Sequence, residues 1–377
     1  AKKTAIDVLR RAVDTVDGLR HRTNSVLPHF ARIGSGNRVS GWKYARIPDS
    51  EYSTVDTALY YFATLLAADI LDQPTVRGKL LDGIAAIDFD VLTATNGFVS
   101  HGVATNGATL LHLADGGSHA DETVWRHWGG ETALVLMLKK ANQILRAERK
   151  MPVRNMAFNM DKDGTVYHGR GFIAEVQSLF FPQFARSVPD AISGVNWAQA
   201  RGDLLRAQQA FFRQPAWAAT DAGRLGLYGL SAGEVHPDLF GLPDVQHPYT
   251  NTYGSFGTQV SDRRDTNCVD AARNGRVLHP HYVLMSYLSG DDAQRAYARK
   301  ALETMEQTGL FPPFGLVEAF SADDTSKSLA LFSSLNAGFE TIAAYHIQAA
   351  EEGKADLIYQ AAGRDGLLAA ALQLLYP

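Results

Sequence analysis

The chain has 377 residues, of which 46% are hydrophobic and 20% are charged, as is typical of a globular protein with a large core. Its 36 basic and 40 acidic residues give a formal charge of -4, so the sequence offers no cationic surface for a nucleic acid. No run approaches the roughly 18 consecutive apolar residues that a membrane span needs. The single Cys268 excludes an internal disulfide and a CxxC metal site.

Apolar residues recur at three- and four-residue spacing through most of the chain, which predicts amphipathic helices. Over residues 4–20 this stripe consists of Ile6, Leu9, Val13, Val16 and Leu19. A second helix is expected to begin at Ser53 and to end before Pro74. Further helices are predicted over residues 76–87, 130–149, 172–185, 197–213, 280–288, 291–308, 326–339, 340–351 and 355–375.

Few strands are expected, and the loops hold most of the Gly, Asp, His, Trp and Tyr residues. The longest loops cover residues 33–50, 98–128, 156–171, 228–277 and 311–325, and loops of such length are generally functional. No short repeat indicates a solenoid. We therefore expect an all-α protein, an (α/α)6 barrel built as a toroid of helical hairpins with long loops at one end. Because no linker interrupts the sequence, residues 1–377 are expected to form a single domain.

Asp56 lies three residues after Ser53, whose hydroxyl group can cap the predicted helix. One interpretation is a variant capping box with no further role. The other is that Asp56 points into a cleft from the N-terminal end of the helix, where the helix dipole keeps it ionised. An ionised carboxylate suits a general base or an acceptor for a sugar hydroxyl group.

A second boundary between a polar loop and an apolar helix lies at residues 125–131. Trp125 and Trp128 lie three residues apart there, before two glycines and Glu131. They offer an apolar platform for a sugar ring, and apolar surroundings raise the pKa of a carboxyl group, as a general acid requires. Alternatively, both Trp residues belong to the core and Glu131 only complements the helix dipole.

An aromatic and Gly-rich loop begins at Tyr228 and continues through Tyr253 to Asp262 and Arg263. Aromatic faces interleaved with charged groups suit a polyhydroxylated ligand, because CH faces stack on rings and hydroxyl groups pair with charges. A solvated loop with internal ion pairs is the alternative. Trp42, in an earlier loop, is predicted to join these residues as a sugar contact.

Glu318 ends another aromatic loop and is a candidate second carboxylate, with an ordinary surface acid as the alternative. Glycoside hydrolysis uses two carboxyl groups across one bond, and their separation decides between inversion and retention. The sequence predicts no cofactor. His279 and His281 lack metal-ligand spacing on one helical face, and no phosphate loop is present.

Four fragments stand in order between roughly residues 40 and 350. They are Ser-Thr-Val-Asp-Thr-Ala-Leu at 53–59, Trp128 with Gly-Glu-Thr-Ala-Leu at 130–134, Leu-Gly-Leu-Tyr-Gly-Leu-Ser-Ala at 225–232, and Gly-Leu-Phe at 309–311 leading to Val-Glu-Ala-Phe at 317–320. Together they resemble the glucoamylase-like (α/α)6 domain, a group that includes bacterial endo-β-1,2-glucanases. The resemblance implies an (α/α)6 toroid and an inverting hydrolase acting on β-glucan or a related polysaccharide.

The resemblance also implies roles for particular residues. Glu131 occupies the place of the acidic residue in the family's Tyr-Ser-Glu segment, and Asp56 that of the Asp in its Ser-Thr-x-Asp-Thr-Ala segment. Two segments depart from the pattern. The family's His-Gln-Tyr-Ser-His segment, beside its sugar subsite, corresponds to residues 174–178, where both His are lost and Glu175 is gained. The Asp of its Tyr-Asp-Ala-Phe segment is Glu318. A different linkage, or a charged exopolysaccharide contacted by Arg263 and Arg264, therefore stays open.

The leading hypothesis is an inverting glycoside hydrolase with Glu131 as general acid and Asp56 or Glu318 as the base or water-positioning group. Its substrate is expected to be a bacterial polysaccharide met in the periplasm or outside the cell. One alternative is a polysaccharide lyase acting on a uronate-containing glycan, which would depend on His279, His281 and Tyr282. The other is a non-catalytic glycan-binding component of a polysaccharide export system.

Overall fold

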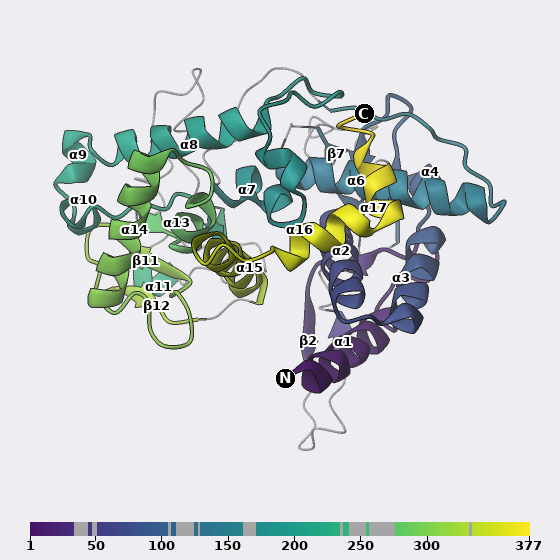
Figure 1. The fold of residues 1–377 in the computed structure, drawn as a ribbon, viewed down its shortest axis with the longest axis horizontal. Coiled ribbons are helices and arrows are strands. Elements are labelled where there is room, and N and C mark those ends of the chain that lie inside the picture. The colour runs from purple at the N-terminus through teal and green to yellow at the C-terminus, as the bar shows by residue number, and fades with distance from the viewer. Residues whose placement is uncertain are drawn as a thin grey trace. The chain divides into compact units, whose positions relative to one another are not determined.

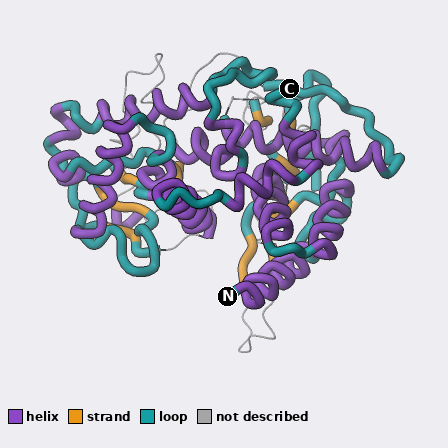
Figure 2. The backbone as a smooth tube through the Cα atoms, viewed as in Figure 1, coloured by secondary structure: helices purple, strands orange, loops and turns teal. Residues whose placement is uncertain are grey.

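Helices make up most of the described chain (Figure 2). The computed structural model describes residues 1–33, 44–46, 51–104, 107–110, 124–126, 129–160, 171–233, 237–240, 254–255, 276–331 and 334–377. Two compact units share these residues. Unit 1 comprises Ala1–Lys162, Asp190–Gly194 and Leu357–Pro377, and unit 2 comprises Asp163–Pro189 and Val195–Asp356.

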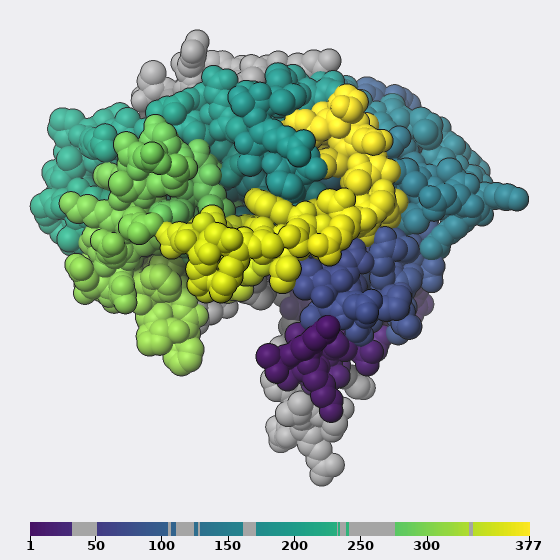
Figure 3. All heavy atoms as spheres, viewed as in Figure 1, coloured from purple at the N-terminus to yellow at the C-terminus, as the bar shows by residue number. Residues whose placement is uncertain are grey.

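Unit 1 is organised around three helices, α2 (Thr54–Ile70), α3 (Pro74–Ala86) and α6 (Gly130–Glu148), which pack against one another. The last helices of the chain complete this packing, because α16 (Leu357–Arg364) lies against α2 and α17 (Gly366–Leu372) against α6 (Figure 1). In Figure 3 the end of the yellow C-terminal segment accordingly borders the blue atoms of the early helices of this unit. Among the described residues the unit also contains α1 (Lys2–Asp17) and α4 (Phe89–Leu92).

Short antiparallel strands lead into two of these helices. One sheet has the strand order β1 (Leu27–Pro28), β4 (Tyr52–Ser53) and β6 (Gly102–Val103), and its middle strand β4 directly precedes α2. A second sheet pairs β5 (Val99–Ser100) with β7 (Val124–Trp125), the last strand before α6. A third pair joins β2 (Ala31–Ile33) to β3 (Tyr44–Arg46). Glycine is required at position 102, because a Cβ atom there would lie 1.7 Å from the carbonyl oxygen of Tyr52. The register of the β4–β6 pair depends on this close approach.

Unit 2 packs α13 (His281–Ser286) against α7 (Gly171–Phe180), α14 (Asp292–Gln307) and α15 (Ser334–Glu351). The helix α8 (Trp197–Phe211) lies on α7, and three short helices follow as α9 (Pro215–Ala218), α10 (Asp221–Leu225) and α11 (Pro237–Phe240). One sheet has the order β10 (Val277–Leu278), β11 (Ala319–Ser321) and β12 (Ser328–Leu329), and β8 (Ala232–Gly233) pairs with β9 (Gly254–Ser255).

The prediction of an all-α chain is confirmed, but the predicted helices differ from the structure in three regions. The region 326–351 forms β12 and one helix, α15, instead of two helices. The helix predicted over 355–375 is divided by Asp365, whose side chain accepts the N–H groups of Leu367 and Leu368 and so begins α17. The helix predicted over 172–185 ends before Pro182, where a 3-10 helix (Pro182–Ala185) begins, because proline cannot supply the next helical hydrogen bond. Among the described helices, none is long and apolar enough to cross a membrane.

Candidate functional site

The first candidate site lies at the N-terminal end of α2 in unit 1, where pairing of β1 with β4 brings His29 to Glu51. The backbone N–H of His29 donates to the carbonyl of Glu51 at 2.8 Å, and the ring Nδ1 donates to Glu51 Oε1 at 2.5 Å. On the other side of the ring, Nε2 lies 3.9 Å from Asp56 Oδ2. Asp56 is held in the first turn of α2, where its backbone N–H donates to Ser53 Oγ at 3.3 Å. One imidazole ring therefore lies between two carboxyl groups.

The charges in this group act strongly on one another. Burial lowers the pKa of His29, but the hydrogen bond to Glu51 and the negative charges of Asp56, Glu51 and Glu131 raise it more, so the net direction is upward. Burial raises the pKa of Glu51, but the hydrogen bond and the positive charge of His29 lower it more, so the net direction is downward. Both shifts favour the charged forms, the direction expected where an imidazole ring donates a hydrogen bond to a carboxylate.

Burial raises the pKa of Asp56, although His29 and the hydroxyl group of Ser53 both act to lower it. This direction corrects the expectation that the helix dipole dominates, because the loss of hydration at a buried carboxylate outweighs the favourable position at a helix start. The side chain is 24% exposed, yet its Oδ2 atom is buried and has no hydrogen-bond partner among the described residues. A buried carboxyl oxygen with an unmade hydrogen bond is rare and calls for an explanation.

Trp125 and Glu131 lie beside this group. The indole Nε1 of Trp125 donates to Thr54 Oγ1 at 2.7 Å, and Thr54 is the first residue of α2. The Trp125 ring also packs on His101, with 4.3 Å between ring centroids. Glu131 is an acidic residue in the first turn of α6, close enough for its charge to raise the pKa of His29. Three residues predicted for the site, Asp56, Trp125 and Glu131, thus come together in unit 1.

Sequence reasoning missed His29 and Glu51. Neither residue belongs to a helical stripe or a recognised motif, and their proximity depends on a two-residue strand pair between Leu27–Pro28 and Tyr52–Ser53. Such short pairs leave almost no alternation pattern to detect. The one signal that the sequence carried was the position of Glu51 next to the predicted helix start.

A second group of polar residues surrounds Glu318 in unit 2. The Glu318 side chain is 3% exposed, and its Oε1 accepts a hydrogen bond from Asn336 Nδ2 at 2.5 Å. Its backbone carbonyl accepts from His279 Nδ1 at 3.0 Å. Position 233 must be glycine here, since a Cβ atom would lie 2.4 Å from Glu318 Oε1 and 2.6 Å from His279 Nδ1. The structure therefore fixes this carboxyl group tightly.

Glu340 is a further acidic residue of this group that sequence reasoning did not identify. Burial raises its pKa to about 8, assisted by the negative charge of Glu318 and opposed by a hydrogen bond from the backbone of Leu316. Asn336 and Glu340 are four residues apart on α15, so both lie on the face that holds the segment from Leu316 to Glu318. In the sequence, Glu340 is indistinguishable from an ordinary polar residue of an amphipathic helix.

Two predicted sugar contacts have structural partners instead. Glu175 is fully buried, and its Oε2 accepts from Arg201 Nε at 2.7 Å and from Ser289 Oγ at 2.6 Å. Tyr228 is also fully buried, with its hydroxyl group 3.3 Å from Ser286 Oγ. Because neither side chain has exposed surface, neither Glu175 nor Tyr228 can contact a sugar directly, and both predictions are wrong.

The residues on which a lyase would depend are buried as well. Burial lowers the pKa of His279 to about 4 and that of His281 well below its ordinary value. Burial also raises the pKa of Tyr282 well above its ordinary value, which keeps the phenol protonated. His281 Nε2 lies 2.9 Å from Ser231 Oγ. With no exposed surface on the imidazole of His279 or the phenol of Tyr282, this arrangement does not support proton abstraction from a polymer.

Six predicted contacts lie outside the described residues, namely Trp42, Trp128, Tyr253, Asp262, Arg263 and Arg264. Within the described ranges, no group of three or more His, Cys, Asp or Glu residues is arranged to hold a metal ion.

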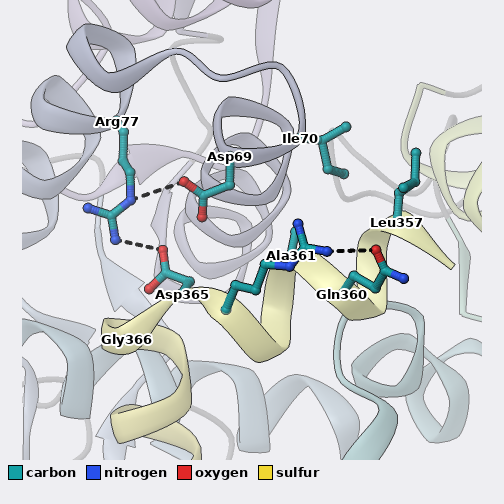
Figure 4. A pocket seen from close by; sticks show the side chains of 9 residues that line it. Asp69, Ile70, Arg77, Leu357, Gln360, Ala361, Asp365 and Gly366 are labelled. Atoms are coloured by element: carbon teal, nitrogen blue, oxygen red, sulfur yellow. Dashed lines mark hydrogen bonds and ion pairs between the residues drawn. The ribbon is translucent and has the colours of Figure 1, made fainter. Parts of the chain in front are cut away.

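A cavity of about 420 Å³ in unit 1 is lined by residues of α2, α3, α16 and α17 (Figure 4) and is separate from the group at the start of α2. Arg77 bridges two of its lining residues, with Nε 3.1 Å from Asp69 Oδ1 and Nη2 2.7 Å from Asp365 Oδ2. Asp69 is 13 residues after Asp56 on the same helix, a separation of about 20 Å at the rise of an α-helix. Since its charged groups largely pair with one another, we assign this cavity a structural role.

Three solved structures have folds similar to this chain. A "putative glucoamylase" from Bacteroides caccae matches with a TM-score of 0.62 and 14% identity, over 97% of this chain and 80% of that one. Proteins of the same description from Bacteroides fragilis and Bacteroides uniformis match with TM-scores of 0.65 and 0.58, both at 12% identity, over 99% of this chain and over 81% and 97% of theirs. No family model matches the sequence, and no curated protein matches it. The chain thus has a glucoamylase-like, all-α fold.

Proposed function

We propose that this protein is a glycoside hydrolase that cleaves a bacterial β-glucan or a related exopolysaccharide with inversion. The observation that carries the proposal is the group at the start of α2, where Asp56 has a buried oxygen without a hydrogen-bond partner among the described residues. A water molecule or sugar hydroxyl group would supply the missing hydrogen bond. The glucoamylase-like fold and the carboxyl group of Glu131 nearby support the same conclusion.

Two carboxyl groups with different tasks perform this chemistry. Glu131 donates a proton to the glycosidic oxygen as the bond from that oxygen to the anomeric carbon breaks. Asp56 accepts a proton from the water molecule whose oxygen forms the new bond to the anomeric carbon. The positive charge of His29 stabilises the Asp56 carboxylate, which its burial otherwise disfavours. Glu318 is not assigned a role in this step, because its carboxyl group is buried and bonded to Asn336. Trp125 contributes an aromatic surface beside the scissile bond.

The proposal extends to the setting of the reaction. Polysaccharide-degrading enzymes generally meet their polymers outside the cytoplasm, so we propose a periplasmic or secreted protein. We also propose that units 1 and 2 belong to one catalytic domain, as the uninterrupted helical sequence predicts.

The proposal is tested by reducing-end release from a panel of neutral and uronate-containing bacterial polysaccharides. We expect Glu131→Gln to lower release by about a thousandfold, the scale on which a general acid and its electrostatic contribution act. Glu148→Gln is the matched control, because Glu148 is an exposed residue at the other end of the same helix. Equal activity of Glu131→Gln and Glu148→Gln would remove Glu131 from the mechanism.

A further inference from the structure

Glu51 takes no part in the proposed hydrolysis, although it bonds directly to His29, the ring that stabilises Asp56. Its Oε1 atom accepts a hydrogen bond from the ring Nδ1 at 2.5 Å, and its side chain is 31% exposed. An ionised carboxylate can only accept hydrogen bonds, so this contact places the Nδ1 proton on the side of Glu51. The other ring nitrogen, Nε2, is thereby the one that faces Asp56.

The orientation of the His29 ring is fixed by contacts on several sides. The backbone N–H of His29 donates to the carbonyl of Glu51 at 2.8 Å, which ties the two main chains together beside the bond between the side chains. The ring also stacks on Phe30, with 4.0 Å between ring centroids and an interplanar angle of 23°. The Nε2 atom is therefore held toward Asp56 Oδ2, which lies 3.9 Å away.

Several charged groups act on this ring. Burial lowers the pKa of His29, and the hydrogen bond to Glu51 is the largest influence that raises it, ahead of the charges of Asp56, Glu51 and Glu131. Burial raises the pKa of Glu51, and the positive charge of His101 helps His29 to lower it. Glu51 is therefore the group that does most to favour the protonated form of the ring.

Glu51 acts on Asp56 in two opposite ways. Burial raises the pKa of Asp56, the positive charge of His29 lowers it, and the negative charge of Glu51 raises it by less than His29 lowers it. In the absence of His29, Glu51 would hinder the ionisation of Asp56, because like charges repel. With the ring in place, Glu51 promotes the ionisation of Asp56 by favouring the protonated imidazole.

We propose that Glu51 is a positioning residue that acts on Asp56 through the imidazole ring of His29. Glu51 holds the Nδ1 side of the ring, so that the Nε2 side and its positive charge are presented to the Asp56 carboxylate. The proposal rests on the proposed function, which gives Asp56 its task as the base, but it concerns the control of ionisation and not the bond that is cleaved.

The titration of His29, followed by NMR of its ring nitrogens, tests this linkage without requiring turnover. The protein carries nitrogen-15 in its histidines, and the His29 signals are identified by their loss in His29→Gln. Glu51→Gln keeps an oxygen that accepts the Nδ1 proton but removes the charge, so we expect the titration midpoint of His29 to fall by about 1 pH unit, the scale on which opposite charges at this distance act. Asp56→Asn should also lower the midpoint. The control Glu148→Gln, at an exposed position of α6, should leave it unchanged.

The pH profile of kcat/KM on a hydrolysed polysaccharide tests whether the linkage reaches Asp56. We expect Glu51→Gln to move the acid limb to higher pH by about 1 pH unit. In the His29→Gln background the same substitution should no longer move the limb upward, because it then removes only the repulsion between Glu51 and Asp56. A purely structural role of Glu51 would lower activity at every pH, with no such dependence on His29.

The outcomes separate this proposal from the proposed function. Hydrolysis together with an unchanged His29 midpoint in Glu51→Gln, or an upward shift of the acid limb that persists without His29, would overturn the positioning role and leave the hydrolase intact. A raised KM with an unchanged pH profile would also overturn it and make Glu51 a sugar contact. If no polysaccharide is hydrolysed, the hydrolase is overturned, whereas lower His29 midpoints in both Glu51→Gln and Asp56→Asn would still support the linkage through the ring.

Discussion

Replacing Glu340 by glutamine should stabilise the protein at neutral and alkaline pH. The pKa of Glu340 is raised from 4.5 to about 8 in the folded protein, chiefly by burial. In the unfolded chain the carboxyl group ionises near its ordinary pKa of 4.5, whereas in the folded protein it is half ionised only at about pH 8. The favourable contribution of the neutral carboxyl group is therefore complete below pH 4.5 and is lost progressively as the pH rises from 4.5 to about 8. The glutamine side chain of the variant would keep the hydrogen bond from Leu316 and would not ionise.

The magnitude follows from the difference in pKa. A pH of 7 lies 2.5 units above the ordinary pKa of 4.5 that the carboxyl group has in the unfolded chain. This difference sets an upper limit of about 3 kcal/mol on the gain in the free energy of unfolding. Partial solvent exposure of the side chain reduces this, so we expect a gain of about 1 to 3 kcal/mol in the free energy of unfolding. At pH 4 the gain should vanish, since the carboxyl group is then neutral in both states.

Urea unfolding of wild type and Glu340→Gln at pH 4, 5.5, 7 and 8, followed by circular dichroism, measures this dependence. Glu306→Gln provides the control, because Glu306 is an exposed residue of α14 in the same unit. A gain that stays constant from pH 4 to pH 8, or a loss of stability at pH 7, would refute the assignment of a raised pKa to Glu340.

Two further predictions concern unit 1. His29→Gln removes a positive charge that lowers the pKa of Asp56. If Asp56 acts as the base, the acid limb of the pH profile of kcat/KM should therefore move to higher pH. An acid limb at the same pH in both proteins would exclude that role. Arg77→Met leaves the buried carboxylate of Asp365, 4% exposed, without its guanidinium partner, and should lower the free energy of unfolding by about 3 kcal/mol. Thermal melts compare this variant with the control Arg364→Met, which changes an exposed residue of α16. Equal melting temperatures of the two variants would contradict the prediction.

The helices were predictable because they bury apolar stripes that recur at helical spacing. α2 and α6 begin where the polar loops meet apolar residues, at Thr54 and Gly130, so the sequence located Asp56 and Glu131 at the starts of helices. Helix ends were harder to predict. Asp365 divides a continuous apolar pattern by capping a new helix with its side chain, and the pattern on either side gives no sign of the break.

The surroundings of the site residues could not be predicted, since they depend on contacts between distant parts of the chain. His29 reaches Asp56 through a two-residue strand pair. The pKa of Glu340 depends on burial against a loop 24 residues earlier in the chain. The direction of the Asp56 shift was predicted wrongly for the same reason, because helix position is visible in a sequence and burial of one oxygen atom is not.

Hydrolysis in water enriched in oxygen-18 tests the central claim most directly. Wild type is incubated with the polysaccharide panel, and the products are analysed by mass spectrometry beside those of Glu131→Gln. A hydrolase places one heavy oxygen on the anomeric carbon of each new reducing end, and we expect saturated, labelled products that are nearly absent with the variant. Unlabelled products with unsaturated uronate ends would establish a lyase, and polymers that bind without any cleavage would establish a glycan-binding protein; either result would contradict the account.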